Sequence, residues 1–375
     1  MTDMKIILAC FLHLDELPPM MTILKIISKK YDVLYIGVDN WSDSYKKLFG
    51  EKVTFINLLK QNVSNTDRLI DKIRNKIYWK TYHHYLRKCS SIIERNYTEG
   101  DLIWIHHEYS LMHMRKLDLP YYLTMYELHK DLFKDRCLLK ERIKKAEKVI
   151  VPEYTRAAIV QACVGLDNLP AVIPNKPYDY EEKLTRLTNN PIDGMVERAH
   201  DEGKKIIIYS GIFLRERKLE PFIESIRKLK DKYIMVLIGR KSKYLEELVN
   251  RYPEVQYLGF YDPPAHLSVI EKADVGILTY VADCGSINPV FCAPNKIWEY
   301  AKYGIPMLCN DIPGLKYTVE YNRFGYCCNI NSIDSICNAL ERIFDEYVQL
   351  SRNAKDYYAA VDMEDIVLEL VGGNS

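Results

Sequence analysis

The chain contains two successive sets of short apolar segments, each separated from the next by a stretch with helical periodicity. Short runs rich in Val, Ile and Leu that alternate with helices are typical of parallel sheets covered by helices on both faces. In the first half, the expected strands are Lys5–Cys10, Val33–Val38, Val53–Ile56, Leu102–His106, Tyr121–Met125 and Lys148–Val151. In the second half, they are Lys205–Ser210, Ile234–Ile238, Val255–Leu258, Val275–Leu278, Ile305–Cys309 and Gly325–Asn329.

The break between the two sets falls at VIPNKP, residues 172–177, where prolines and a polar stretch up to Gly203 interrupt the alternation. A chain of 375 residues is also long enough for two domains. We therefore predict an α/β protein with two Rossmann-like, doubly wound parallel-sheet domains, at residues 1–176 and 177–345. The remaining residues, 346–375, continue a helical pattern, and we expect two helices between Leu340 and Val371.

Composition excludes several classes of protein. The net charge is +1, from 52 basic and 51 acidic residues, so no overall field favours nucleic acid as a partner. No segment reaches the run of about eighteen apolar residues that a membrane-spanning helix requires. The N-terminal segment lacks a small-residue cleavage site, so we expect a first core strand rather than a signal peptide. The 10 cysteines are scattered without C-x-x-C spacing, which favours free thiols in a cytoplasmic protein.

Residues 295–307, NKIWEYAKYGIPM, carry the most specific local signal. We expect a short helix that ends at Gly304, because glycine enters the left-handed conformation without steric cost, followed by a buried strand. Lys296 and Glu299 are spaced i, i+3 and therefore share one helix face. A cation and a carboxylate there suit a ligand with phosphates and vicinal hydroxyls, which is the chemistry of a nucleotide sugar. The alternative is that Glu299 is a surface acid paired with Lys296 or Lys302.

This segment resembles the donor-binding helix of GT-B glycosyltransferases, specifically the retaining group 1 (family four) type. The resemblance covers residues 100–345 and is strongest over 205–328; further segments that fit in order and spacing are 206–229, 234–249, 257–279 and 312–327. It implies a GT-B fold in which two domains face a central cleft and the last helix crosses back to the first domain. The second domain then holds the nucleotide-sugar donor and the first recognises the acceptor.

The resemblance places the donor in loops outside the carboxyl ends of the second domain's strands. Gly211 lets the backbone approach the ligand, and two of the cations Arg215, Arg217 and Lys218 grip the diphosphate beside a helix N-terminus. Relatives carry an arginine where this chain has Ile212, so the choice among the three cations stays open, and a solvated basic loop is the alternative. The remaining donor-binding assignments are Gly239, Arg240, Tyr261, Ser286, Ile287, Asn288, Lys296 and Glu299.

The loop at 283–291 departs from the commonest family pattern. Many relatives have a glutamate eight residues before the one that corresponds to Glu299, but this chain has Phe291 there. The segment instead resembles the subgroup that reads Asn-Lys-x-x-Glu-Tyr, in which Glu299 accepts hydrogen bonds from ribose hydroxyls. Small residues in the loop would let backbone N–H groups reach phosphate or sugar oxygens.

Two segments of the first domain carry the other candidates. His107 lies at a strand end where relatives often have a cleft-facing histidine, so we assign it to sugar or acceptor contact. Adjacent histidines such as His106 and His107 are otherwise one packed and one exposed ring, and they point apart, which disfavours a metal site. Tyr126 stands where relatives have a histidine near the reacting carbon, and His129 is a candidate substitute. The residues assigned to catalysis are Arg217, Lys218, Tyr126 and His107.

The resemblance implies a hexosyl- or related glycosyltransferase of polysaccharide biosynthesis that retains anomeric configuration. The donor is UDP- or GDP-linked, and the acceptor is a glycan or polyprenyl-linked glycan. The chain has no Asp-x-Asp pair, so we expect neither a metal nor another cofactor, and no Gly-x-Gly-x-x-Gly or Walker-type loop supports an oxidoreductase or a kinase. The alternatives are a nucleotide-sugar 2-epimerase, which shares the fold, and a non-catalytic GT-B-like nucleotide-binding partner subunit, which Tyr126 and Phe291 motivate.

One basic segment bears on where in the cell the protein acts. Residues 68–95 carry a net charge of +6 and interleave basic with aromatic and aliphatic side chains. A basic amphipathic helix of this kind suits the surface of an anionic membrane, whereas a packed helix with a solvated basic face is about as good an interpretation. Because many relatives extend lipid-linked glycans, we expect a cytoplasmic protein that is peripheral on the inner face of the membrane.

Overall fold

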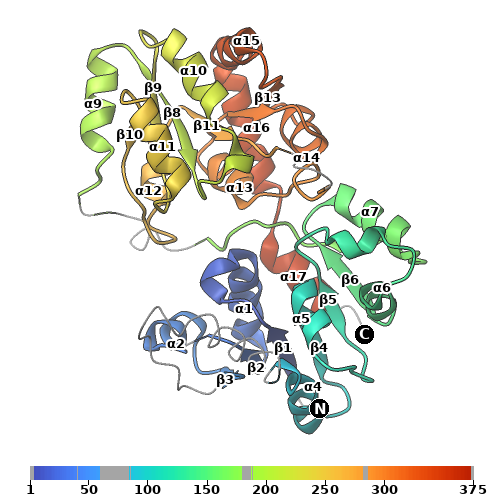
Figure 1. Cartoon of the computed structure of the whole chain (residues 1–375). Coiled ribbons are helices and arrows are strands. Elements are labelled where there is room, and N and C mark those ends of the chain that lie inside the picture. The colour runs from blue at the N-terminus through green and yellow to red at the C-terminus, as the bar shows by residue number, and fades with distance from the viewer. Residues whose placement is uncertain are drawn as a thin grey trace, which may run out of the picture. The chain divides into compact units, whose positions relative to one another are not determined.

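The computed structural model describes residues 4–39, 41–59, 84, 86–179, 187, 189–281 and 286–372. The chain forms two compact units, one made of Met1–Pro174 with Met363–Ser375 and one made of Asn175–Asp362 (Figure 1). The chain therefore passes to the second unit close to the boundary expected at residue 176. It returns to the first unit at Met363, within the C-terminal segment 346–375.

The first unit is a parallel sheet in the order β3-β2-β1-β4-β5-β6-β7, with helices on both faces (Figure 1). Its strands are β1 (Ile6–Cys10), β2 (Val33–Gly37), β3 (Val53–Asn57), β4 (Leu102–His106), β5 (Tyr122–Thr124), β6 (Lys148–Val151) and β7 (Ala171–Val172). Its helices are η1 (Leu14–Glu16), α1 (Pro18–Lys30), α2 (Asp43–Phe49), α4 (Cys89–Asn96), α5 (Glu108–His113), η2 (Lys130–Phe133), α6 (Leu138–Ile143), α7 (Tyr154–Val164) and α17 (Met363–Gly372). Strands β1, β2 and β4 are buried along their whole length, as expected for a sheet covered on both faces.

The second unit repeats this architecture with a parallel sheet in the order β10-β9-β8-β11-β12-β13. Its strands are β8 (Lys205–Ser210), β9 (Tyr233–Ile238), β10 (Gln256–Tyr257), β11 (Val275–Leu278), β12 (Met307–Asn310) and β13 (Gly325–Cys328). Its helices are α9 (Asp193–Asp201), η3 (Arg215–Arg217), α10 (Glu220–Lys228), α11 (Lys243–Arg251), α12 (Leu267–Ile270), α13 (Asn295–Lys302), α14 (Pro313–Leu315), η4 (Lys316–Glu320), α15 (Ile333–Asp345) and α16 (Tyr347–Ala359).

Alternate residues of the central strands build two separate cores in the second unit. Ile207 and Tyr209 of β8 pack on one side of the sheet with helices α10, α11 and α15. Ile206 and Ile208 of the same strand pack on the other side with α9, α12, α13 and α16. This division follows from the period-two alternation of side chains along a strand, and it places α12 and α13 next to each other on one face.

The C-terminal segment after α15 contains the two helices α16 and α17. Helix α16 stays with the second unit and packs on α13, where the rings of Trp298 and Tyr357 are stacked with centroids 4.9 Å apart. Helix α17 belongs to the first unit and contacts α1, where Lys29 Nζ lies 2.5 Å from a carboxylate oxygen of Glu364. Only α17 thus makes the return that the resemblance implies.

The basic segment 68–95 lies mostly outside the described residues, and its last part, 89–95, forms all but the final residue of α4. Within the ranges that the structure describes, no helix is long and apolar enough to cross a membrane.

Candidate functional site

The order of strands in the second unit reverses between β8 and β11, because the chain first adds strands on one side of β8 and then on the other. Ligands of doubly wound sheets bind outside the carboxyl ends of the strands at such a switch point. The two loops that leave this point contact each other, since the backbone N–H of Val281 donates to the carbonyl of Glu216 at 2.8 Å. The predicted cations Arg215, Arg217 and Lys218 lie in the first of these loops.

Two glycines bring the loops after β8 and β9 into backbone contact. Gly211 has φ = 137°, and its N–H donates to the carbonyl of Ile238 at 3.0 Å. Gly239 has φ = 150°, and a Cβ atom on it would lie only 2.0 Å from the carbonyl oxygen of Gly211. A side chain at residue 239 would therefore have to displace the backbone of the Gly211 loop.

Lys296 lies in the first turn of α13, and its side chain extends to the Gly211 loop. Its Nζ lies 4.2 Å from the ring centroid of Tyr209 and 5.6 Å from that of Tyr280, and it would lie 3.0 Å from a Cβ on Gly211. Burial, reinforced by the nearby charge of Arg217 and opposed by that of Glu299, lowers the pKa of Lys296 to about 7. The amine thus lies close to two aromatic rings. Its pKa is such that it gains or loses its charge near neutral pH.

Arg217 is the second cation at this point. Its guanidinium lies 4.1 Å from the ring centroid of Tyr280. Arg217 and Lys296 therefore both lie near the ring of Tyr280. Among the residues that the structure describes, no carboxylate oxygen lies within ion-pair distance of Arg217 or of Lys296, so their positive charge remains available to an anion.

The other two predicted cations point to different partners. Arg215 forms a salt bridge with Glu247 on α11, and its guanidinium lies 5.8 Å from the ring centroid of Tyr244. Lys218 has a left-handed backbone with φ = 33°, and its Nζ donates to Asn331 at 2.9 Å. Of the three cations left open by the sequence, only Arg217 lies beside Lys296.

Glu299 lies one helical turn after Lys296, and its side chain is only 14% exposed. Its Oε1 lies 3.3 Å from Nε2 of His266, the residue that immediately precedes α12. Burial acts to raise the pKa of Glu299, but His266 and Lys296 outweigh it, and the pKa lies below its ordinary value. The alternative, a surface acid paired with Lys296 or Lys302, does not match the structure. The Glu299 side chain is largely buried, Lys302 pairs with Asp179 at 2.9 Å, and within the described residues Lys296 forms no ion pair with Glu299.

Sequence reasoning missed His266, Tyr209 and Tyr280. The two tyrosines end or follow buried strands, a position that marks them as candidates once the strands are known. Nothing in the sequence singles out His266, because its contact with Glu299 depends on how α12 and α13 pack.

The remaining donor-site assignments lie around the same edge of the sheet. Arg240 follows β9, and its guanidinium lies 4.6 Å from the ring centroid of Phe260. The Tyr261 hydroxyl donates to the carbonyl of Leu258 within its own loop. Ser286, Ile287 and Asn288 belong to the loop before α13, where the carbonyl of Ile287 accepts from the N–H of Val290 at 3.1 Å. Residues 282–285 of that loop lie outside the described residues.

In the first unit, the predicted residues gather at its own switch point, after β4. The Tyr126 hydroxyl lies 2.9 Å from Nδ1 of His106, and the rings of His107 and Tyr126 are 5.9 Å apart. His107 has φ = 72° and is the N-cap residue of α5, where its Nδ1 accepts from the N–H of Tyr109 at 3.1 Å. Burial lowers the pKa of His106 to about 3 and that of His107 to about 4, so both rings are neutral near pH 7.

A buried carboxyl group supports this cluster. Glu108 is 2% exposed, and its Oε2 accepts from the N–H of Tyr126 at 3.2 Å. Burial raises the pKa of Glu108 to about 7. The Tyr126 carbonyl in turn accepts a hydrogen bond from the buried guanidinium of Arg156. Tyr126 and His107 are thus brought together, with the Tyr126 hydroxyl directed at the interior histidine.

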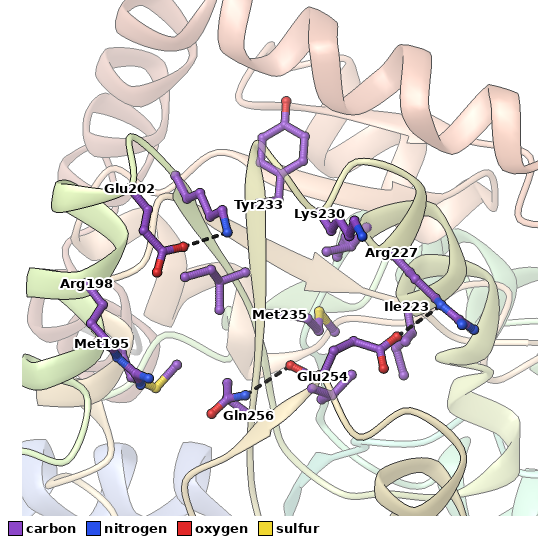
Figure 2. A pocket seen from close by; sticks show the side chains of 14 residues that line it. Met195, Arg198, Glu202, Ile223, Arg227, Lys230, Tyr233, Met235, Glu254 and Gln256 are labelled. Atoms are coloured by element: carbon purple, nitrogen blue, oxygen red, sulfur yellow. Dashed lines mark hydrogen bonds and ion pairs between the residues drawn. The ribbon is translucent and has the colours of Figure 1, made fainter.

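A separate hollow of about 210 Å³ lies at the amino ends of β8, β9 and β10 (Figure 2). Two ion pairs line it, Lys204 with Glu202 at 2.6 Å and Arg227 with Glu254 at 3.5 Å. The hollow contains none of the predicted site residues, and it lies at the edge of the sheet opposite to the one where such folds bind ligands.

Comparison with known proteins identifies the second unit. Residues 204–346 match the family described as glycosyl transferases group 1. Residues 204–346 of the second unit form a group 1 glycosyltransferase domain. The family and the enzyme class expected from the sequence are confirmed by this match, and Gly211, Arg217, Lys296 and Glu299 all lie within the matched residues of the glycosyltransferase domain. No curated protein matches the chain in sequence.

Solved structures extend the likeness to the whole chain. Sucrose-phosphate synthase from Thermosynechococcus elongatus is similar with a TM-score of 0.66 and 15% identity over 98% of each chain. The Anabaena protein HepE, in complex with UDP, is similar with a TM-score of 0.67 and 14% identity over 99% of each chain. A glycosyltransferase from Rickettsia africae ESF-5 is similar with a TM-score of 0.66 and 12% identity over 100% of each chain. The glycosyltransferase domain is therefore one half of a GT-B fold, as predicted.

Proposed function

We propose that this protein transfers a sugar from a nucleoside diphosphate sugar, UDP- or GDP-linked, to a glycan or lipid-linked glycan acceptor. The proposal rests on the pair of cations Arg217 and Lys296 at the switch point. They lie near Gly211, whose backbone no side chain of its own covers. Solved structures of HepE with UDP and with UDP-glucose support a uridine nucleotide as the first donor to test.

The chemistry of the site suits each part of such a donor. The two cations would hold the diphosphate, and the Glu299 carboxylate would accept hydrogen bonds from the vicinal hydroxyls of the ribose. As the bond between sugar and diphosphate breaks, negative charge builds on the leaving diphosphate. Cations fixed in advance over aromatic rings stabilise that charge without having to reorganise. An anion bound here would also favour the charged form of Lys296.

We further propose retention of anomeric configuration without a metal ion. In this scheme the leaving diphosphate takes the proton of the acceptor hydroxyl, so the protein needs no general base. Turnover in excess EDTA would support metal independence, and complete loss on chelation would rule it out. The anomeric configuration of the product, read by NMR, would decide between retention and inversion.

The decisive test separates transfer from its two alternatives. We expect calorimetric titration to show binding of UDP or GDP, and we expect release of the nucleoside diphosphate from the matching donor to depend on an added glycan acceptor. Conversion of the donor to its epimer without acceptor would identify a 2-epimerase. Nucleotide binding with no turnover under any acceptor would favour a non-catalytic partner subunit, which the departures at Tyr126 and Phe291 motivate.

The source of the acceptor is a separate proposal that rests on the sequence of residues 68–95, because most of this segment lies outside the described residues. Each basic residue near an anionic membrane contributes about 1 kcal/mol, so a net charge of +6 favours sedimentation with anionic rather than neutral vesicles. Replacing Lys72, Lys76 and Lys80 with Glu should release the protein while nucleotide binding persists. If the wild type does not bind anionic vesicles at low salt, the alternative interpretation holds, and the segment is a packed helix with a solvated basic face.

A further inference from the structure

The buried carboxylate of Glu299 is held from outside its own helix. Glu299 lies on α13, and its partner His266 lies at the end of the loop that leads into α12. Both side chains are largely buried, at 14% and 15% exposure. A carboxylate in this position can rotate about its terminal bonds unless a partner fixes one of its oxygens.

The chemistry of the pair determines where the hydrogen lies. Glu299 is ionised, because its pKa lies below the ordinary value, and a carboxylate can only accept hydrogen bonds. Nε2 of His266 lies 3.3 Å from Oε1 and must carry its hydrogen for this contact with the carboxylate to be favourable. Within the described part of the chain, Oε2 of Glu299 has no hydrogen-bond partner, so this oxygen remains for a ligand.

The backbone of His266 is itself fixed. Its carbonyl accepts from the N–H groups of Val269 at 3.1 Å and Ile270 at 3.2 Å in the turn that becomes α12. Leu267 of α12 and Ile297 of α13 belong to the same buried core, so the two helices hold His266 and Glu299 at a constant separation. The ring nevertheless leaves its Nδ1 buried without a partner among the described residues. A residue kept for packing alone would be better replaced by an apolar one.

We infer that His266 is a positioning residue for Glu299 and that it sets the strength of nucleoside recognition without touching the donor. The inference rests on the proposed function, because it assumes that Glu299 faces the ribose. By holding Oε1, His266 orients Oε2 toward the vicinal hydroxyls. Recognition of the diphosphate by Arg217 and Lys296 is independent of this arrangement.

The test compares two probes, UDP and inorganic pyrophosphate, by calorimetric titration. We expect His266→Ala to weaken UDP binding about tenfold, the effect of losing one charge-assisted hydrogen bond, and to leave pyrophosphate binding unchanged. His266→Gln should restore most of the UDP affinity, because its amide nitrogen can take the place of Nε2, whereas His266→Asn should behave like His266→Ala. In a Glu299→Ala background, His266→Ala should have no further effect on UDP binding.

Each other outcome overturns the inference in a recognisable way. Full UDP affinity in His266→Ala means that Glu299 needs no positioning. Equal weakening with and without Glu299 means that His266 acts by another route. Equal loss of UDP and pyrophosphate affinity in both His266→Ala and His266→Gln indicates general damage to the domain. A wild type that binds pyrophosphate but neither UDP nor GDP refutes the proposed function itself.

Discussion

Replacing Arg217 with Met is expected to lower kcat about a hundredfold or more, whereas replacing Lys218 with Met should change it less than about threefold. Charge builds on the diphosphate only as the donor bond breaks, so a cation at the site contributes more to the transition state than to the ground state. Arg217 lies over Tyr280 beside Lys296, but Lys218 is bound to Asn331 away from that pair. The two substitutions remove the same charge from neighbouring residues, which makes Lys218→Met a matched control.

The measurement is the rate of release of the nucleoside diphosphate at saturating donor, with the thermal midpoint of each variant as a check on folding. Binding of UDP should weaken much less than turnover in Arg217→Met. Similar kcat values for the two variants would show that Arg217 is not the cation that faces the diphosphate.

Replacing Glu299 with Ala is expected to weaken nucleotide-sugar binding about ten- to a hundredfold, because a charge-assisted hydrogen bond contributes about 1.5–3 kcal/mol. The carboxylate is 14% exposed and has one oxygen free of hydrogen bonds within the described residues. Glu271→Ala is the control, since Glu271 lies on the turn after α12 and is 37% exposed beside Lys272. Calorimetric titration with UDP and with its 2′-deoxy analogue measures the effect.

The deoxy analogue makes this prediction specific to the ribose. If Glu299 holds the ribose hydroxyls, the wild type should bind the 2′-deoxy nucleotide more weakly than UDP, and Glu299→Ala should bind both with similar affinity. Unchanged UDP affinity in Glu299→Ala would remove this residue from the donor site.

The strands were predictable because each is a short, nearly continuous apolar run, and parallel sheets covered on both faces leave that trace in the sequence. Of the strands in the described residues, only β7 (Ala171–Val172) was not predicted, because such a short strand shortly before a proline carries no periodic signal. The end of α13 also followed from local chemistry, as Gly304 has φ = 67°. Local rules are sufficient where the deciding interaction lies within a few residues.

The details of the site were not predictable in the same way. The sequence places Arg215, Arg217 and Lys218 in one loop, but their different directions depend on Glu247 and Asn331, which are remote in the chain. The same holds for His266, which meets Glu299 only through the packing of two helices. The donor motif therefore predicts a region of the chain, and tertiary contacts decide which of its residues lie together in the candidate site.

The position of Lys296 over Tyr209 has a consequence for how binding responds to the composition of the buffer. With its pKa at about 7, a fraction of the free protein carries a neutral amine there, and an anion that draws Lys296 into its charged form must take up a proton from solution. Affinity should then fall as pH rises above 7, by up to about tenfold for each pH unit, until the pKa of the complex is reached. Burial is the main cause of this lowered pKa; among the ionisable neighbours, Arg217 lowers it further, and Glu299 and Cys292 raise it. The observed heat of binding should differ between buffers of different ionisation enthalpy, and it should become independent of the buffer in Lys296→Met.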